Sequence, residues 1–428
     1  MESLEELKEK IKEAVDGNKE GIIRLSREIH SHPELGYEEF HAVKYISGFL
    51  REHNYEVKES YGSIPTSFRA DAKGAETKKG PVVAILAEYD ALNGIGHGCG
   101  HNVIASCAVG AFLGLSSVIE KLEGSVCIIG TPAEEGGAGK VKLLENGAFD
   151  DVDFAVMIHP SGAEGNISGR GGRAACSVNV SFHGKGAHSS GPQNGINALS
   201  AAIHLFNQID MMRAVFQVQD NINGIISKGG TAANVIPDEA ECQFCIRADT
   251  MKRIKELIVL IKTCAANAEN LTGAKASVTE GTISAERYPN RPMCESFKAN
   301  MENLLVSMHW ADPGKLYGSS DIGNVSIKLP AIHEYLSITS DSGIQAHTVE
   351  YAEAAKSQKA DEVCISGAKG LAMTGCDILY DKEFQEKIKA YHKQQVPDFY
   401  FDSENQLLKG GISSCTRFQN LQKSSLKK

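Results

Sequence analysis

Helical and extended patterns of apolar residues alternate along the first part of the chain. Apolar residues three and four positions apart predict helices, and short continuous apolar runs between them predict buried strands. The helices are expected at 18–32, 39–53, 102–120 and 140–146, and the strands at 55–58, 82–86, 125–130 and 154–158. This alternation predicts an α/β layer structure around a central mixed sheet.

The order of elements changes after a glycine cluster at Gly169, Gly171 and Gly172. Strands are expected next at 175–182, 222–227, 239–248 and 276–283, with helices at 196–212 and 251–271. The order β-α-β-β-α-β is that of a ferredoxin-like unit. Helical patterns then resume at 296–308, 348–373 and 381–392. We therefore predict a discontinuous α/β domain formed by 1–172 and 286–402, an inserted ferredoxin-like domain at 173–285, and a polar tail at 403–428.

Composition and charge narrow the class of protein. With 428 residues, of which 42% are hydrophobic and 23% charged, the chain is long enough for two or three globular domains. The 44 Lys and Arg against 54 Asp and Glu give a net charge of -10, and the only basic cluster is 423–428, so no nucleic-acid partner is expected. No run of about 18 apolar residues occurs, so no membrane span is expected.

The cysteines indicate a reducing compartment. Eleven cysteines are scattered singly from Cys99 to Cys415, without the spacing of a disulfide framework. The first residues of the sequence also lack the apolar segment of a secretory signal. The thiols are therefore expected to be reduced, which predicts a cytoplasmic enzyme.

The most informative polar segment, 87–102, lies between an apolar strand and a helix. In open α/β sheets, ligands bind beyond the carboxyl ends of the strands, so Asp90, Cys99 and His101 are placed for a site. Gly100 permits a tight turn that lets the thiolate and the imidazole reach one metal ion. A chance Cys-x-His pair is the alternative for this segment taken alone.

Two further strands end in possible metal ligands. Glu134 and Glu135 follow the strand at 125–130, and adjacent carboxylates repel unless a cation lies between them or one is protonated. We expect one to bind metal and the other to act as general base, with a solvated acidic turn as the alternative. His159 follows the next strand, where the alternative is a structural histidine. Three strand ends carrying thiolate, imidazole and carboxylate together favour a site for Zn, Mn, Co or Ni.

Several motifs occur in order along residues 20–395. They are Arg27–Glu39, Cys99-Gly-His101, Pro132-Ala-Glu-Glu135, His159-Pro160, Gly186-Ala-His-Ser189, Asn234-Val-Ile-Pro237 and Gly318–Asn324. Together they resemble the family of metallopeptidases and amidohydrolases that includes aminoacylase, carboxypeptidase G, hippurate hydrolase and the auxin-conjugate hydrolases. The segment 88–102 is most similar to the subgroup of β-alanyl-lysine dipeptidases and aminobenzoyl-glutamate hydrolases.

The resemblance, carried over residue by residue, implies a centre of two divalent metal ions per subunit. The implied ligands are Cys99, which bridges the ions, with His101, Glu135, His159 and His347. The resemblance also implies that Glu134 is the general base and that Asp90 orients a ligand histidine. Four of these ligands also follow from the strand-end pattern, whereas His347 follows from the resemblance alone.

The resemblance further implies that the inserted domain is a lid and the contact surface of a homodimer. His188 is expected to reach the active site of the partner subunit and to stabilise the oxyanion, with a turn histidine on the lid as the alternative. Asn234 and Arg247 match positions that contact the substrate. The guanidinium of Arg247 suits the binding of a substrate carboxylate. The alternative for Arg247 is an exposed arginine on a strand, which is the commoner case.

The expected function is hydrolysis of an amide bond by a metal-activated water. The substrate class is a small dipeptide or an N-acyl amino acid. The alternative is a catalytically silent metal-binding or scaffolding homologue that keeps the fold and the dimer. The presence of both Glu134 and Glu135 argues against this alternative, because a binding protein needs no general base.

Overall fold

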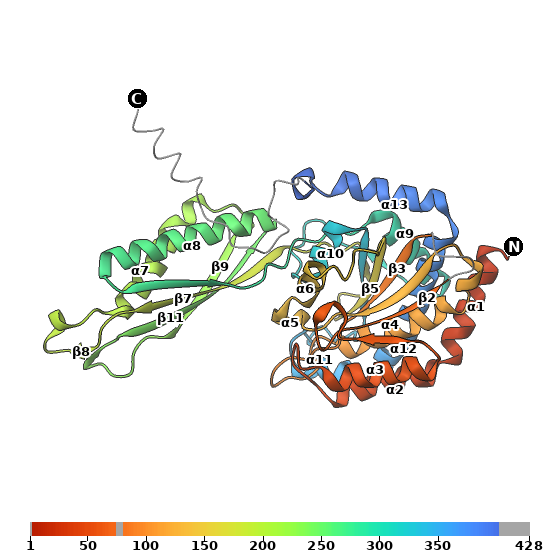
Figure 1. Ribbon diagram of the computed structural model, residues 1–428, viewed down its shortest axis with the longest axis horizontal. Coiled ribbons are helices and arrows are strands. Elements are labelled where there is room, and N and C mark those ends of the chain that lie inside the picture. The colour runs from red at the N-terminus through yellow and green to blue at the C-terminus, as the bar shows by residue number, and fades with distance from the viewer. Residues whose placement is uncertain (1, 74–79, 402–428) are drawn as a thin grey trace, which may run out of the picture.

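The computed structural model describes residues 2–73 and 80–401 and contains a larger and a smaller unit (Figure 1). The larger unit is built on a sheet of strand order β1-β2-β4-β3-β5-β14-β6-β13. Its strands are β1 (Val57–Glu59), β2 (Phe68–Lys73), β3 (Val82–Ala87), β4 (Ser125–Gly130), β5 (Phe154–Ser161), β6 (Ile167–Ser168), β13 (His309–Trp310) and β14 (Ala331–Ser337). The strands β4, β3, β5 and β14 are parallel, and β1, β2 and β6 pair in antiparallel fashion, so the sheet is mixed.

Helices cover both faces of this sheet. Val83 and Ile85 of β3 belong to a core with α1, α2, α4, α9 and α12, whereas Ala84 and Leu86 belong to a core with α6 and α10. Alternate residues of a strand point to opposite faces, so a strand covered on both sides must be apolar throughout. The helices of this unit are α1 (Leu4–Gly17), α2 (Lys19–Ser31), α3 (Phe40–Glu52), α4 (His101–Ser116), α5 (Glu134–Gly137), α6 (Gly139–Glu145), α9 (Arg291–Asn303), α10 (Ile322–Lys328), α11 (Val349–Ala354), α12 (Gln358–Tyr380) and α13 (Lys382–Gln395).

The smaller unit is an antiparallel sheet of order β12-β7-β11-β9 with two helices packed on it. Its elements are β7 (Ala174–His183), α7 (Ala198–Met211), β9 (Asn221–Lys228), β11 (Glu239–Ala248), α8 (Met251–Thr272) and β12 (Lys275–Glu280). Along β11 every second residue is buried, as expected for a strand with helices on one face only. A short ribbon of β8 (Ala187–His188) and β10 (Val235–Ile236) extends from the end of this unit that lies away from the larger one (Figure 1).

The structure differs from the predicted elements in several places. The helix predicted at 348–373 is two helices, α11 and α12, because the side chain of Ser357 accepts a hydrogen bond from the N–H of Ala360 and begins a new helix. The helix predicted at 296–308 is α9, which begins at Arg291 after the cap Asn290. The elements α1, α10, β2 and β14 have no predicted counterpart. Among the described residues, no helix has the length and apolar character needed to cross a membrane. The predicted tail at 403–428 lies outside the described residues.

Candidate metal centre and active site

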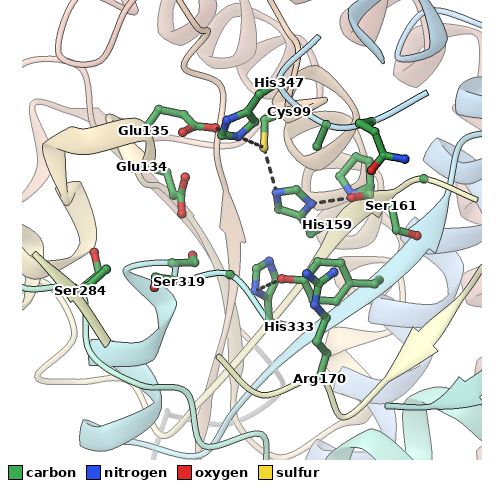
Figure 2. A pocket seen from close by; sticks show the side chains of 18 of the residues that line it. Cys99, Glu134, Glu135, His159, Ser161, Arg170, Ser284, Ser319, His333 and His347 are labelled. Carbon is green, nitrogen blue, oxygen red and sulfur yellow. Dashed lines mark hydrogen bonds and ion pairs between the residues drawn. The ribbon is translucent and has the colours of Figure 1, made fainter. Parts of the chain in front are cut away.

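Three neighbouring strands, β4, β3 and β5, end at one edge of the central sheet. The loops after these strands carry the predicted ligand motifs. They border a cavity of about 800 Å³, whose wall includes the ligand-type side chains of Cys99, Glu134, Glu135, His159 and His347 (Figure 2). The strand ends therefore bring together groups that lie far apart in the sequence.

Gly100 sets the geometry of the turn between Cys99 and His101. Its backbone is left-handed, with a φ of 77°, and a Cβ at this position would lie 2.9 Å from Cγ of Pro160. Glycine adopts this positive φ without strain, and it has no Cβ that would collide with Pro160. The turn begins helix α4 at His101, buries the imidazole completely and leaves Cys99 at the wall of the cavity.

Two sets of donor atoms share Cys99. Its Sγ lies 3.5 Å from Nε2 of His159 and 3.6 Å from Nε2 of His347. One set is Cys99, His101 and His159, the other is Cys99, Glu135 and His347, and within each set the donor atoms lie within 4.8 Å of one another. This arrangement suits two metal ions that share a thiolate.

Asp90 holds both the first histidine and the glutamate loop. Its Oδ1 lies 3.0 Å from Nδ1 of His101, and its Oδ2 accepts the N–H of Glu135 at 2.8 Å. Burial would raise the pKa of Asp90, but His101 and the N–H of Glu135 hold it below its ordinary value. An ionised Asp90 accepts a hydrogen bond from the N–H at Nδ1 of His101, which leaves Nε2 of His101 free for a metal ion.

The loop that carries the two glutamates has a strained backbone. Ala133 and Ala138 are both left-handed, with φ of 56° and 50°, a costly conformation for a residue other than glycine. The carboxyl group of Glu39, within the Arg27–Glu39 motif, accepts the N–H of Ala133 at 2.7 Å. Glu39 thus ties the N-terminal motif to the start of α5, where the two glutamates lie.

Glu134 and Glu135 have opposite electrostatic environments. Burial, Glu88 and Glu135 raise the pKa of Glu134 well above its ordinary range. Burial acts in the same direction on Glu135, but His347, whose Nε2 lies 3.2 Å from Oε1 of Glu135, and His101 hold its pKa below the ordinary value. Neighbouring carboxyl groups whose pKa values are shifted in opposite directions are typical of active sites in which one group transfers protons and the other stays ionised.

His347 reaches the cavity from the loop before α11. Its backbone is left-handed, with a φ of 67°, and its N–H donates to the carbonyl of Gly98 at 2.8 Å. This hydrogen bond places the loop of His347 against the turn of Cys99. The sequence around position 347 has no periodic pattern or strand end that would have pointed to the site.

The donor groups fit a divalent transition metal. Nε2 of His101 is buried and has no hydrogen-bond partner among the described residues. Burial raises the pKa of the Cys99 thiol, so a cation is needed to hold it as a thiolate. Burial and His101 lower the pKa of His159 to about 3, which keeps its ring neutral and able to coordinate. Thiolate, imidazole and carboxylate donors together suit a metal such as zinc.

Comparison with known proteins decides the family. The chain is 35% identical over 410 residues to the Xaa-Arg dipeptidase of Mus musculus, and the match covers 92% of this chain and 94% of that protein. The family model of the peptidase dimerisation domain matches residues 170–270. This chain belongs to the M20 peptidase family.

A second M20 relative is a component of the p-aminobenzoyl-glutamate hydrolase of Escherichia coli, which is 24% identical over 92% of this chain and 96% of its own length. The fold is that of a dinuclear metal-binding M20 peptidase from Bacillus subtilis, with a TM-score of 0.63 at 21% identity over 85% of this chain and 99% of that one. The predicted family, the α/β fold with its inserted domain, and the class of metal-dependent amidohydrolase are thereby confirmed.

The residues predicted on the inserted domain of this M20 enzyme lie in two places. Arg247, on β11, lines the cavity, and its Nη1 donates to Oγ of Ser319 at 3.0 Å. His188 and Asn234 lie on or beside the ribbon of β8 and β10, are exposed, and are absent from the described residues that line the cavity. The structure therefore brings Arg247 to the cavity of the metal-ligand motifs of its own chain and leaves His188 and Asn234 outside the lining of that cavity.

Sequence reasoning missed the polar wall of the cavity opposite the glutamates. His333 and Tyr335 project from β14, and the guanidinium of Arg170 lies 4.2 Å from the ring centre of Tyr335 (Figure 2). Ser319 and Ser320 line the same wall and belong to the Gly318–Asn324 motif, whose residues carry no predicted role. That motif was the one signal in the sequence that could have pointed to this wall.

Proposed function

We propose that this M20 enzyme hydrolyses the amide bond of a small dipeptide or N-acyl amino acid whose leaving part has a free carboxylate. The observation that carries the proposal is the pair Glu134 and Glu135, whose pKa values are pushed in opposite directions beside two donor sets that share Cys99. The identity of 35% to a Xaa-Arg dipeptidase makes dipeptides that end in arginine the first substrates to test.

The metal centre takes two divalent ions per subunit, chosen from Zn, Mn, Co and Ni. The residues that hold them are Cys99, His101, Glu135, His159 and His347. The bound ions supply Lewis-acid chemistry, since they polarise the scissile carbonyl and make a water molecule more acidic.

The protein's own acid–base step belongs to Glu134. Its carboxylate accepts a proton from the attacking water and delivers it to the nitrogen of the leaving amine. Burial and the neighbouring carboxyl groups raise the pKa of Glu134, and a bound cation would offset this by stabilising the carboxylate that accepts the proton. Asp90 is a positioning residue, because its hydrogen bond to Nδ1 fixes the tautomer and the direction of His101.

The carboxylate of the substrate binds to Arg247. This guanidinium lines the cavity and is held toward it by the hydrogen bond to Ser319. A guanidinium offers two parallel donors to a carboxylate, so it also orients the amide bond relative to Glu134. Arg170 adds a second positive charge to the same cavity, which favours an anionic substrate.

The active unit is a homodimer in which His188 of the partner subunit completes each site. Three observations support this arrangement. The inserted domain matches the peptidase dimerisation domain. The strand β9 lies at a sheet edge and exposes Ile225 and Ile226 by 57% and 39%. His188 and Asn234 are neighbours through the hydrogen bond from Ser189 N–H to the Asn234 carbonyl, at 3.0 Å, and lie apart from their own cavity. In the dimer, His188 donates to the oxyanion and Asn234 contacts the substrate.

A cytoplasmic location agrees with the state of the thiols. The cysteines of the described part of the chain are all free, and most of them are buried. Reduced thiols are the normal state in a reducing compartment.

The first experiment tests the reaction and the metal together. Purified protein is analysed for metal, and hydrolysis is measured for dipeptides ending in Arg or Lys, for N-acetyl amino acids and for aminobenzoyl-glutamate. We expect about two metal ions per subunit and turnover of at least one substrate class. Metal-loaded protein without hydrolysis of any of these amides would favour the catalytically silent homologue instead.

The second experiment separates the roles of the two glutamates. Glu134→Gln should keep its metal while kcat falls by roughly 10²- to 10⁴-fold, the usual weight of general base catalysis. Glu135→Gln should lose metal. The exposed Glu145→Gln on α6 is the matched control and should change neither quantity. Loss of metal in Glu134→Gln and its retention in Glu135→Gln would reverse the two roles.

A further inference from the structure

Arg287 is a buried positive charge without an acidic partner. It lies between β12 and α9, and its side chain is 6% exposed. Its guanidinium donates to Nδ1 of His333, to Oη of Tyr335 at 2.7 Å and to the carbonyl of Gly318 at 3.1 Å. None of these acceptors is a carboxylate, and no Asp or Glu of the described residues pairs with Arg287. A buried charge is costly without a counter-ion, so an anion is expected close to this cluster.

Arg287 also fixes the proton of His333. The side chain of arginine can only donate hydrogen bonds, so Nδ1 of His333 must accept, and the proton of the ring is on Nε2. Nε2 is buried and has no hydrogen-bond partner among the residues that the structure describes. His333 therefore carries an N–H donor that the protein itself leaves unused, which is unfavourable in a buried place unless a bound molecule accepts the hydrogen bond.

The unused donor lies beside the metal-ligand motifs. His333 lines the cavity from β14, and its ring packs edge-on against that of His159, with ring centres 5.3 Å apart. Figure 2 shows His333 across the site from Glu135 and His347. A substrate group that accepts from Nε2 would therefore be held on the wall of the cavity opposite the glutamates.

Positive charge gathers around this wall. Arg170 and Arg247 both line the cavity. Arg247 donates to Oγ of Ser319, and Arg287 donates to the carbonyl of the preceding residue, Gly318, so the two guanidinium groups hold consecutive residues of one loop. With Glu134 and Glu135 on the other side, the cavity has a negative and a positive wall. The anionic end of a substrate belongs at the positive wall.

We propose that His333 is a specificity-determining residue that donates its Nε2–H to the free carboxylate of the substrate. Arg287 is its positioning residue, because it orients the donor and supplies a buried positive charge behind it. The inference rests on the proposed hydrolase function and deepens it. Arg247 and His333 then each bind one oxygen of the carboxylate, and this pair of contacts selects substrates that end in a free acid.

The test compares alanyl-arginine with alanyl-arginine amide, which lacks the carboxylate. The enzymes are the metal-loaded, full-length wild type, His333→Phe and Arg287→Met. A hydrogen bond to a charged group contributes about 10- to 100-fold in binding. We expect His333→Phe to lower the ratio of kcat/KM for the acid to that for the amide by this factor, mainly through KM, with unchanged metal content. Arg287→Met should lower the same ratio, because Nδ1 loses its donor.

His309 offers a matched control. It is an exposed histidine on β13 and is absent from the described residues that line the cavity. His309→Phe makes the same substitution in the same sheet and should keep the wild-type ratio. An unchanged ratio in His333→Phe would overturn the proposal. An equal loss of kcat/KM for the acid and the amide would also overturn it, because it would show a purely structural contribution.

A crystal structure of the metal-loaded wild type with arginine, the product that carries the carboxylate, gives a test without a variant. One carboxylate oxygen should lie within about 3.2 Å of Nε2 of His333. A carboxylate bound out of reach of Nε2 would reject the role of His333. A wild type that hydrolyses neither compound would count against the proposed function instead, and the position of arginine in the crystal would still decide the role of His333.

Discussion

Glu39 offers a test of how the N-terminal motif supports the catalytic loop. Its side chain is completely buried, and its Oε1 accepts the N–H of Ala133, the left-handed residue directly before Glu134. Burial raises the pKa of Glu39 from 4.5 to about 7. The substitution Glu39→Gln keeps the size of the side chain and an oxygen that can accept the same hydrogen bond, but it cannot ionise.

The sign and size of the effect follow from this pKa. A carboxyl group whose pKa is higher in the folded than in the unfolded chain favours folding when it is protonated. This contribution is complete below pH 4.5 and is lost as the pH rises to about 7. At 1.36 kcal/mol per pKa unit, the rise from 4.5 to about 7 corresponds to roughly 3 kcal/mol. The wild type should therefore lose about this much stability relative to Glu39→Gln between pH 4.5 and 8.

The assay is equilibrium unfolding by urea, followed at pH values from 4.5 to 8 in the presence of a chelator. The two proteins should have similar free energies of unfolding at the acidic end, and Glu39→Gln should be the more stable at pH 8. Glu38→Gln, at an exposed neighbouring position, controls for the change in net charge. A difference between wild type and Glu39→Gln that stays constant with pH, or that grows in favour of the wild type as pH rises, would refute the reasoning.

Three further predictions concern the site and the dimer. Labelling of Cys99 by a thiol reagent should increase after chelation, because a bound metal shields the thiolate, and equal labelling with and without metal would count against ligation. Gly100→Ala should weaken metal binding and lower the free energy of unfolding by about 2 kcal/mol more than Gly94→Ala does. Both positions have left-handed backbones, but only at Gly100 would an added Cβ meet a neighbouring atom. Equal losses of stability in the two variants would contradict the tight packing of the turn at Gly100. His188→Ala should lower kcat by roughly 10²-fold or more without loss of metal, and mixing it with Glu134→Gln should restore activity toward half that of wild type per heterodimer. No recovery despite verified subunit exchange would argue against a shared site.

The central strands and the inserted domain could be predicted because their patterns are local. The strands β3 and β4 are continuous apolar runs because helices cover both faces, and β11 alternates because one face is exposed. Parallel neighbours end at the same edge of a sheet, so the polar residues after β3, β4 and β5 had to approach one another. For this reason Cys99, His101 and the two adjacent glutamates could be selected from the sequence alone.

The strand β14 shows where local patterns fail. All its residues are buried, yet it carries His333, Glu334 and Tyr335, and its sequence has neither an apolar run nor a clear alternation. Its polar groups are tolerated because of distant partners, such as Arg287, whose guanidinium donates to the hydroxyl of Tyr335 at 2.7 Å. The residues around β14 contain no information about that partner.

The candidate metal centre likewise depends on tertiary structure. His347 approaches Cys99 across a separation of 248 residues, and His159 approaches it across 60 residues. Hydrophobic periodicity reports the burial of each segment and its backbone preference. It does not report which distant loop closes over which strand end, because that choice is made by packing and by single contacts such as the hydrogen bond from His347 to Gly98. The sequence by itself therefore determined the sheet edge and most of the proposed ligands, and only the tertiary structure decided how these residues are paired.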